Sequence, residues 1–365
     1  MSILDTIKTL LKLKSKVVVG LDIGPDAIIV AGLSKSKAGY SLDALGTTPM
    51  PPNAFQDGEI VDSAAVGDAI RTLLDDNNIQ SERAVVAISG QSVIIRLIQT
   101  DPMDEDELET FINYEAERYI PFALDDVNLS SQIVGTSMDD NGNEHMDVLL
   151  VAAQKNLVQS FISTADEAGL TLNVVDVASF AVTRALEKMD HLPDNQTVAA
   201  LLIQGPSTDI NVLAGGGPKF NRSVLIGYSY LVDNLINSLG IDETAARELL
   251  DQLDVDPQGY EDISAEVEQA TEIIRPALSE LTGEISRSLD FFMSQGGSTI
   301  DRIVICGRGA AIRGLDRFLT TRLGIEVLVA NPFTALGLDD DDIEESQAPI
   351  FVTAVGLALR GLEGP

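Results

Sequence analysis

The chain has 365 residues, 57 acidic and 24 basic, and its formal net charge of −33 makes direct binding to nucleic acid or to an anionic membrane unfavourable. One cysteine, Cys306, excludes an intrachain disulfide framework, and two distant histidines, His145 and His191, argue against a metal site or histidine-based catalysis. No apolar run reaches the ~18 residues that span a bilayer, so we expect a soluble, non-exported protein.

Residues 1–16 place apolar side chains at roughly helical spacing among four lysines, Lys8, Lys12, Lys14 and Lys16. One interpretation is an amphipathic helix that docks on a partner or a membrane surface. The other, which we favour, is a frayed leader before the first strand.

From residue 17 the pattern changes to β-structure, and residues 17–50 predict a meander of three strands. Residues 63–78 predict a helix with one apolar face, and residues 83–101 predict a strand, a Ser-Gly turn and another strand. Asp104 is a candidate N-cap with Glu107 as its capping-box partner, opening a helix that Pro121 stops. Residues 127–154 predict a hairpin with an Asn-Gly turn, followed by a helix from Lys155 to Ala168.

After a turn-rich stretch at 190–196 the pattern restarts. Residues 197–228 again predict three strands, residues 231–299 are mostly helical, and residues 299–331 predict strand, glycine-rich turn, helix and strand. An acidic loop and an apolar helix at 350–362 follow. Two similar halves with glycine turns indicate a duplicated, actin-like α/β fold.

Four segments resemble the PilM family of type IV pilus assembly, relatives of the cell-division protein FtsA: FINYEAERYIPFALDDVNLSSQIVG, VVDVASFAVTRALEKM, LGIEVLVANPF and FVTAVGLALRGL. The resemblance extends from about residue 17 to 362. It implies an actin-like (ribonuclease H-like) duplicated fold, with two cores flanking a cleft and two inserted subdomains. The expected parts are a leader at 1–16, a first core at 17–83 with 173–196 and 350–362, an inserted α+β subdomain at 84–172, a second core at 197–229 with 300–349, and a helical subdomain at 230–299.

The resemblance also implies a function. PilM-like proteins are adaptors at the cytoplasmic face of the inner membrane. They bind the N-terminal tail of the membrane protein PilN in a groove between the first core and the insertion, and link it to the pilus motor. Alternatives are an ATP-binding actin-like switch or ATPase of pilus assembly, and a sister role in type II secretion or cell division.

Family members usually bind ATP with Mg²⁺, and this chain departs from their nucleotide motifs. In the first phosphate loop Asp22 and Gly24 are present, but Pro25 replaces a serine and brings no N–H, and Ile29 replaces a common lysine. In the second loop Leu202 replaces the acid that organises hydrated Mg²⁺. Gln204 replaces a glycine there, while the other loop residues are retained: Gly205, Ser207, Thr208 and Asp209.

The two adenosine-facing elements are altered as well. The helix that usually presents Glu and Lys has Arg247 and Leu250, and Arg308 separates Gly307 from Gly309 in the loop that normally has consecutive glycines. We therefore predict a degenerate cleft and no catalytic residues, with weak ATPase activity as the alternative. We expect Asp209 to be a turn residue that caps backbone amides.

One hypothesis concerns the positively charged side chain of Arg308, at a position that usually carries no side chain. We expect Arg308 to lie in the cleft and to pair with Asp22, Asp26 or Asp209 in place of a metal, since a buried unpaired carboxylate is costly. The alternative is that Arg308 turns outward to a surface acid.

Overall fold

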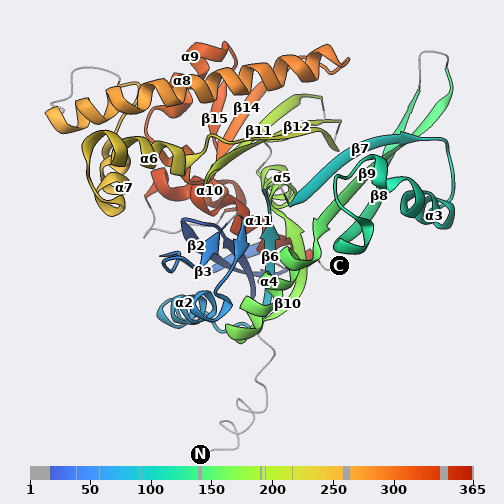
Figure 1. Cartoon of the computed structure of the whole chain (residues 1–365), viewed down its shortest axis with the longest axis horizontal. Helices are drawn as coiled ribbons and strands as arrows, with labels where there is room; N and C mark the ends of the chain where they lie inside the picture. Colours follow the sequence, from blue (N-terminus) through green and yellow to red (C-terminus); the bar gives the residue numbers. More distant parts are fainter. Residues whose placement is uncertain are drawn as a thin grey trace, which may run out of the picture. The chain divides into compact units, whose positions relative to one another are not determined.

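The computed structural model describes residues 17–37, 39–56, 58–90, 92–138, 142–189, 191–193, 195–215, 217–257, 264–337 and 344–363. The leader expected at 1–16 and part of the acidic loop lie outside these residues. The chain forms two compact units, each of which combines separate stretches of sequence (Figure 1). Unit 1 comprises Met1–Ala87, Ser160–Met189 and Asn331–Pro365, and unit 2 comprises Ile88–Gln159 and Asp190–Ala330.

Unit 1 is built on a five-stranded sheet with the order β10-β6-β1-β2-β3. The expected meander is present, because β1 is antiparallel to β2 and β2 to β3, while β6 joins β1 in parallel. The strands are β1 (Val18–Ile23), β2 (Ala27–Ser36), β3 (Gly39–Pro49), β6 (Arg83–Ile88) and β10 (Thr171–Val177), with a small hairpin of β4 (Phe55–Gln56) and β5 (Glu59–Ile60). Its helices are α2 (Ser63–Asp76), α5 (Ala178–Lys188), α10 (Pro332–Leu336) and α11 (Val352–Glu363), with the 3-10 turn η4 (Glu345–Phe351). Helix α4 (Lys155–Glu167) begins in unit 2 and continues into unit 1.

The C-terminal helix α11 packs directly on the first sheet, as expected for residues 350–362. Two glycines allow the contact, since a Cβ added at Gly20 of β1 would lie 1.8 Å from the carbonyl oxygen of Ala354, and one at Gly356 would lie 1.9 Å from that of Ala181 in α5. Arg184 of α5 reinforces this packing by donating to Asp176 at 3.0 Å and to the Gly356 carbonyl at 3.2 Å.

Unit 2 contains a second five-stranded sheet with the order β13-β12-β11-β14-β15. Its three antiparallel strands followed by two parallel ones repeat the strand order of the first sheet, so the structure contains the expected duplication. The strands are β11 (Thr197–Gln204), β12 (Ser207–Ala214), β13 (Gly217–Val224), β14 (Arg302–Cys306) and β15 (Val327–Val329). The helices are α6 (Tyr228–Leu239), α7 (Glu243–Gln252), α8 (Ala265–Ser294) and α9 (Leu315–Leu323), with the 3-10 turn η3 (Arg308–Ala311). They share one apolar core with the sheet, and the long α8 lies over it in Figure 1.

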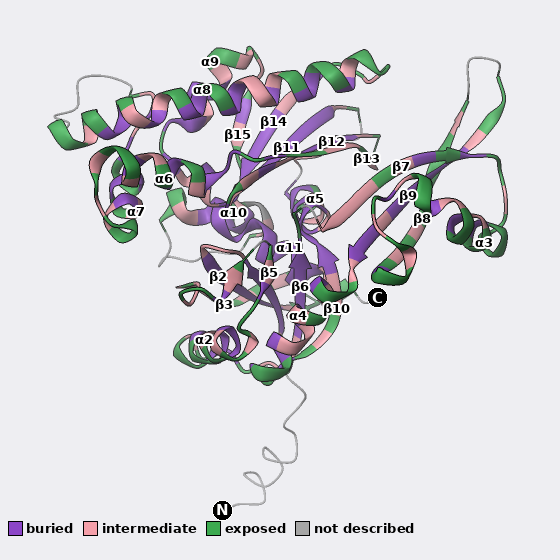
Figure 2. Ribbon diagram, in the orientation of Figure 1, coloured by how far each residue is buried: buried purple, intermediate pink, exposed green. Residues whose placement is uncertain are grey.

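Unit 2 also holds a separate three-stranded sheet with the order β7-β9-β8. Its elements are β7 (Val93–Thr100), β8 (Val127–Met138), β9 (Glu144–Gln154) and α3 (Glu105–Glu115), with short 3-10 turns η1 (Ala116–Arg118) and η2 (Leu124–Asp126). Asp104 and Glu107 form the predicted capping box of α3, and Leu108 and Ile112 of that helix pack on the sheet. Figure 2 shows buried positions along the central β9 and exposed ones along β8.

Two expected boundaries need correction. The insertion predicted at 84–172 is shorter, because Arg83–Ile88 and Thr171–Val177 are both strands of the first sheet. The second core was expected to continue to residue 349, but residues from Asn331 belong to unit 1. There Phe333 of α10 packs against Phe351, with ring centroids 5.8 Å apart.

No helix in the described part of the chain combines the length and the apolar character needed to cross a membrane.

Candidate functional site

The first phosphate-loop residues lie between β1 and β2 of unit 1. Asp22 is 4% exposed at the end of β1, and Ile29 is buried opposite it in β2. The Gly24 N–H donates to the Ala27 carbonyl at 3.0 Å, and Pro25 has no N–H to offer. Two of the positions that should cradle a phosphate therefore provide no free backbone donor.

The second loop is a tight turn between β11 and β12 of unit 2. Gly205 has a left-handed φ of 51°, and its carbonyl accepts from the Ser229 N–H at 2.8 Å. Ser207 is the first residue of β12. The Thr208 side chain is fully buried, and its hydroxyl donates to the Ile226 carbonyl at 2.7 Å. The hydroxyl of Thr208 is thus used inside the fold.

Asp209 is not the turn residue that we expected. It lies within β12, paired in register with Ser223 of β13, and it hydrogen-bonds the Ser223 side chain. Burial raises the pKa of the Asp209 carboxyl, and the hydrogen bond with Ser223 opposes that rise.

Several altered cleft positions have become packing positions. Leu202 of β11 is 2% exposed, and Leu250 of α7 is fully buried in the apolar core of unit 2.

Gly307 has a φ of 83°, and a Cβ there would lie 2.8 Å from the Ile203 carbonyl oxygen. At Gly309 a Cβ would lie 2.3 Å from Ile203 Cγ2. These glycines are required by the contact of η3 with β11, whether or not a nucleotide approaches.

Arg247 and Arg308 meet around a residue that the sequence did not single out. Their guanidinium carbons lie 5.5 Å and 5.1 Å from the centroid of the fully buried Tyr228 ring. Burial raises the pKa of the Tyr228 hydroxyl, and the Arg308 charge opposes the rise. Burial also raises the pKa of the Asp251 carboxyl, and the two arginines oppose it. The structure thus assembles a cluster of two cations, one acid and one tyrosine, which we call the Tyr228 cluster.

The predicted site residues fall into both units. Asp22, Gly24 and Pro25 belong to unit 1, and the remaining ones belong to unit 2. The proposed pairing of Arg308 with Asp22 or Asp26 therefore stays a prediction. Within unit 2, Arg308 acts on Tyr228 and Asp251, whereas the hydrogen-bonding side chain identified beside Asp209 is Ser223. Among the described residues, no three His, Cys, Asp or Glu side chains gather into a group that would hold a metal.

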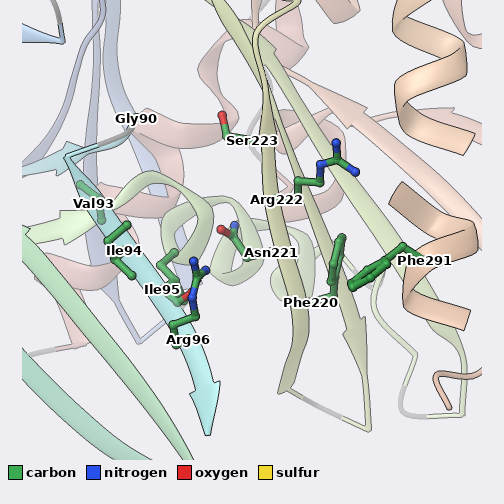
Figure 3. A pocket seen from close by; sticks show the side chains of 10 residues that line it. All are labelled: Gly90, Val93, Ile94, Ile95, Arg96, Phe220, Asn221, Arg222, Ser223 and Phe291. Carbon is green, nitrogen blue, oxygen red and sulfur yellow. The ribbon is translucent and has the colours of Figure 1, made fainter. Parts of the chain in front are cut away.

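Sequence reasoning did not identify a cavity of about 570 Å³ within unit 2 (Figure 3). Its walls are four consecutive residues of β7, four consecutive residues of β13, Gly90, and Phe291 of α8. No local motif marks it, because the two strands are more than a hundred residues apart in the sequence.

Comparisons with known proteins identify the family of the chain and its fold. A family model described as type IV pilus assembly protein PilM matches residues 20–362. Among solved structures, the chain is similar to the "PilM-PilN type IV pilus biogenesis complex", with 29% identity, a TM-score of 0.81, and coverage of 96% of this chain and 99% of that one.

Two more distant structures share the fold. The ethanolamine utilization protein EutJ from Carboxydothermus hydrogenoformans has 15% identity and a TM-score of 0.54, covering 94% of this chain and 89% of that one. MreB5 of Spiroplasma citri bound to ADP has 14% identity and a TM-score of 0.50, covering 95% of this chain and 96% of that one. The fold is actin-like, as the sequence predicts.

Proposed function

The chain belongs to the family of the type IV pilus assembly protein PilM, and on that premise we propose that it is an adaptor that binds the N-terminal tail of a PilN-like inner-membrane protein. The observation that carries this proposal is the similarity, over 96% of this chain, to a PilM-PilN complex. Binding of the tail would hold the chain at the cytoplasmic face of the inner membrane and connect the membrane partner to the pilus motor.

The three-stranded sheet offers a surface suited to such a tail. One face of this sheet packs on α3. Side chains alternate between the two faces of a strand, so Ile95 and Leu97 of β7 and Val151 of β9 point to the opposite face, where they are partly exposed. An extended tail can place alternate apolar side chains on a face of this kind. We assign the tail to this face, which we call the tail face.

We further propose that the nucleotide cleft is degenerate. The first phosphate loop offers few donors to a phosphate, because Pro25 has no N–H and the Gly24 N–H already donates to the Ala27 carbonyl. In the second loop, the Thr208 hydroxyl already donates to the Ile226 carbonyl. Leu202 brings no oxygen to a Mg²⁺ ion, a hard cation that requires oxygen ligands. The residues of unit 2 therefore do not fit Mg·ATP well.

The adenosine side supports the same conclusion. Arg308 stands where a close backbone approach would need glycine, and its guanidinium lies over Tyr228. Since phosphoryl transfer depends on metal charge and positioning, we assign this chain no catalytic step.

The adaptor role is tested by calorimetric titration with a synthetic peptide of the N-terminal tail of the PilN-like protein from the same genome. We expect a dissociation constant below ~100 μM, which corresponds to about −5.5 kcal/mol. Leu97→Glu on the tail face should weaken binding at least ~10-fold, since it places a carboxylate among apolar contacts. Ile133→Glu is the matched control, because Ile133 is 38% exposed and lies opposite Val148, on the α3 side of the same sheet. Absence of binding to the unmodified protein would contradict the adaptor role.

A further inference from the structure

The cavity of unit 2 lies between the free edges of two sheets. In the described part of the chain, β7 ends the sheet β7-β9-β8, and β13 ends the sheet β13-β12-β11-β14-β15. The end strand of a sheet turns a row of backbone N–H and C=O groups away from its only neighbour. Consecutive residues of each strand line the cavity, Val93–Arg96 and Phe220–Ser223. Side chains of one sheet face would come from alternate residues, so the cavity follows the strand edges (Figure 3).

The size of the cavity suits a short extended segment. Four strand residues span roughly 13 Å, and the volume of about 570 Å³ is in the usual range for binding pockets. Extended peptides bind such edges by adding a strand, with main-chain hydrogen bonds for affinity and side-chain pockets for selectivity.

The charge of the lining sets the chemistry of the segment. Two arginines, Arg96 and Arg222, line the cavity, and no acidic residue does, although acidic residues outnumber basic ones 57 to 24 in the chain. Arg222 pairs with Glu284 at 3.3 Å, but Glu284 also accepts from Arg287, so one carboxylate is shared by two arginines. The cavity is therefore a local positive site on an acidic protein.

The cavity also has an aromatic wall. The rings of Phe220 and Phe291 lie 6.1 Å apart in a tilted arrangement, and Phe291 is 53% exposed. Ile94 of β7 adds a partly exposed aliphatic side chain. An apolar side chain of a bound segment would be buried against Phe291 and Ile94.

We propose that this cavity is a second peptide-docking site, which binds an extended acidic segment of a partner protein as a strand added to the edge of β7, with its side chains against β13. Carboxylates of the segment pair with Arg96 and Arg222, and an apolar side chain between them rests on Phe291. Ile95 lines both this cavity and the tail face, whereas Arg96, Arg222 and Phe291 belong to the cavity alone.

A designed peptide tests the site without knowledge of the natural partner. The probe is the acetylated, fluorescein-labelled sequence Glu-Val-Glu-Phe-Glu-Val-Glu, measured by anisotropy at physiological salt. The net charge of −33 opposes non-specific adsorption of an acidic peptide, so binding reports a local site. We expect a dissociation constant below ~1 mM, and no binding of the same peptide with lysine in place of glutamate.

Variants then locate the site. Arg96→Ala combined with Arg222→Ala should weaken binding at least ~10-fold, and Phe291→Ala should weaken it several-fold. Arg275→Ala is the matched control, because Arg275 is a partly exposed arginine of α8 that pairs with Glu272 and does not line the cavity. Equal affinity for the cavity variants and the control would overturn the proposal, as would absence of binding at 1 mM.

A backbone readout separates strand addition from simple charge attraction. N-methylation of alternate amides in the probe should abolish binding, and hydrogen exchange should slow in residues 93–96 when the unmodified probe is bound. Protection at other strands, or equal binding of the methylated probe, would exclude this mode of docking.

Discussion

The guanidinium carbon of Arg308 lies 5.1 Å from the centroid of the Tyr228 ring, and Tyr228 has no exposed surface. The arginine therefore packs on the interior of unit 2 and interacts electrostatically with Asp251. This contact explains how a long side chain is accommodated between Gly307 and Gly309, and it connects the stability of the loop to the proposed degeneracy of the nucleotide cleft.

The first prediction follows from this contact. Arg308→Gly should lower the free energy of unfolding by about 1–2 kcal/mol, because it removes a cation–π contact and adds a flexible residue. It should also give weak but measurable binding of a fluorescent ATP analogue with Mg²⁺, absent from the unmodified protein at ~100 μM.

Arg308→Lys is the control for this prediction. It retains a cation and side-chain bulk, so we expect a smaller loss of stability and no gain of nucleotide binding. Unchanged stability together with unchanged nucleotide binding in Arg308→Gly would show that Arg308 neither supports the loop nor obstructs the cleft.

A second prediction concerns two glycines, Gly20 inside β1 and Gly24 directly after it. Gly20→Ala should destabilise the protein by at least about 1–3 kcal/mol, because the added methyl would meet the Ala354 carbonyl of α11. Gly24→Ala should change stability by less than ~0.5 kcal/mol, since the nearest atom to its Cβ is 3.6 Å away and its φ is not left-handed. Urea unfolding of both variants compares them directly, and equal losses would contradict the close packing of α11 on β1.

The two glycines also show what the sequence could and could not reveal. Both belong to a glycine-containing strand and turn, and the phosphate-loop motif draws attention to Gly24. The structure shows that Gly20 is the position without room for a side chain, and that requirement comes from α11, more than 300 residues away in the sequence. Local pattern predicted the strands, the turn and the terminal helix, but not which residues the helix would touch.

The second phosphate loop shows the same limit. The meander, the glycine turn at Gly205 and the helices that follow are visible from periodicity and turn residues. Asp209 was misplaced, because an Asp after Gly-Pro-Ser-Thr suits a turn by local preference, and its place in β12 depends on the partner strand β13. The Tyr228 cluster was missed for a related reason, since its residues come from α6, α7 and η3.

A third prediction uses the environment of Asp209. Its folded-state pKa is raised by burial, so between its unfolded and folded pKa values the native state retains more proton than the unfolded state. The free energy of unfolding therefore falls as pH rises through that window, and the ionised carboxylate is destabilising at pH 7. Asp209→Asn should thus be more stable than the unmodified protein at pH 7, with a difference that shrinks toward pH 4.

Urea titrations at several pH values measure that difference. Asp290→Asn, an exposed substitution on α8, controls for the loss of one negative charge from an acidic chain. A stability gain of equal size in both variants would mean that net charge, and not the burial of Asp209, is responsible.

We propose that the chain binds a PilN-like tail and that it does so without nucleotide. One calorimetric titration tests both, with the tail peptide added to the full chain in the presence and absence of millimolar Mg·ATP. We predict a dissociation constant below ~100 μM that is the same in both conditions, within a factor of about two. Absence of binding would contradict the proposed tail binding. A tail affinity that changes at least ~10-fold when Mg·ATP is added would contradict binding without nucleotide.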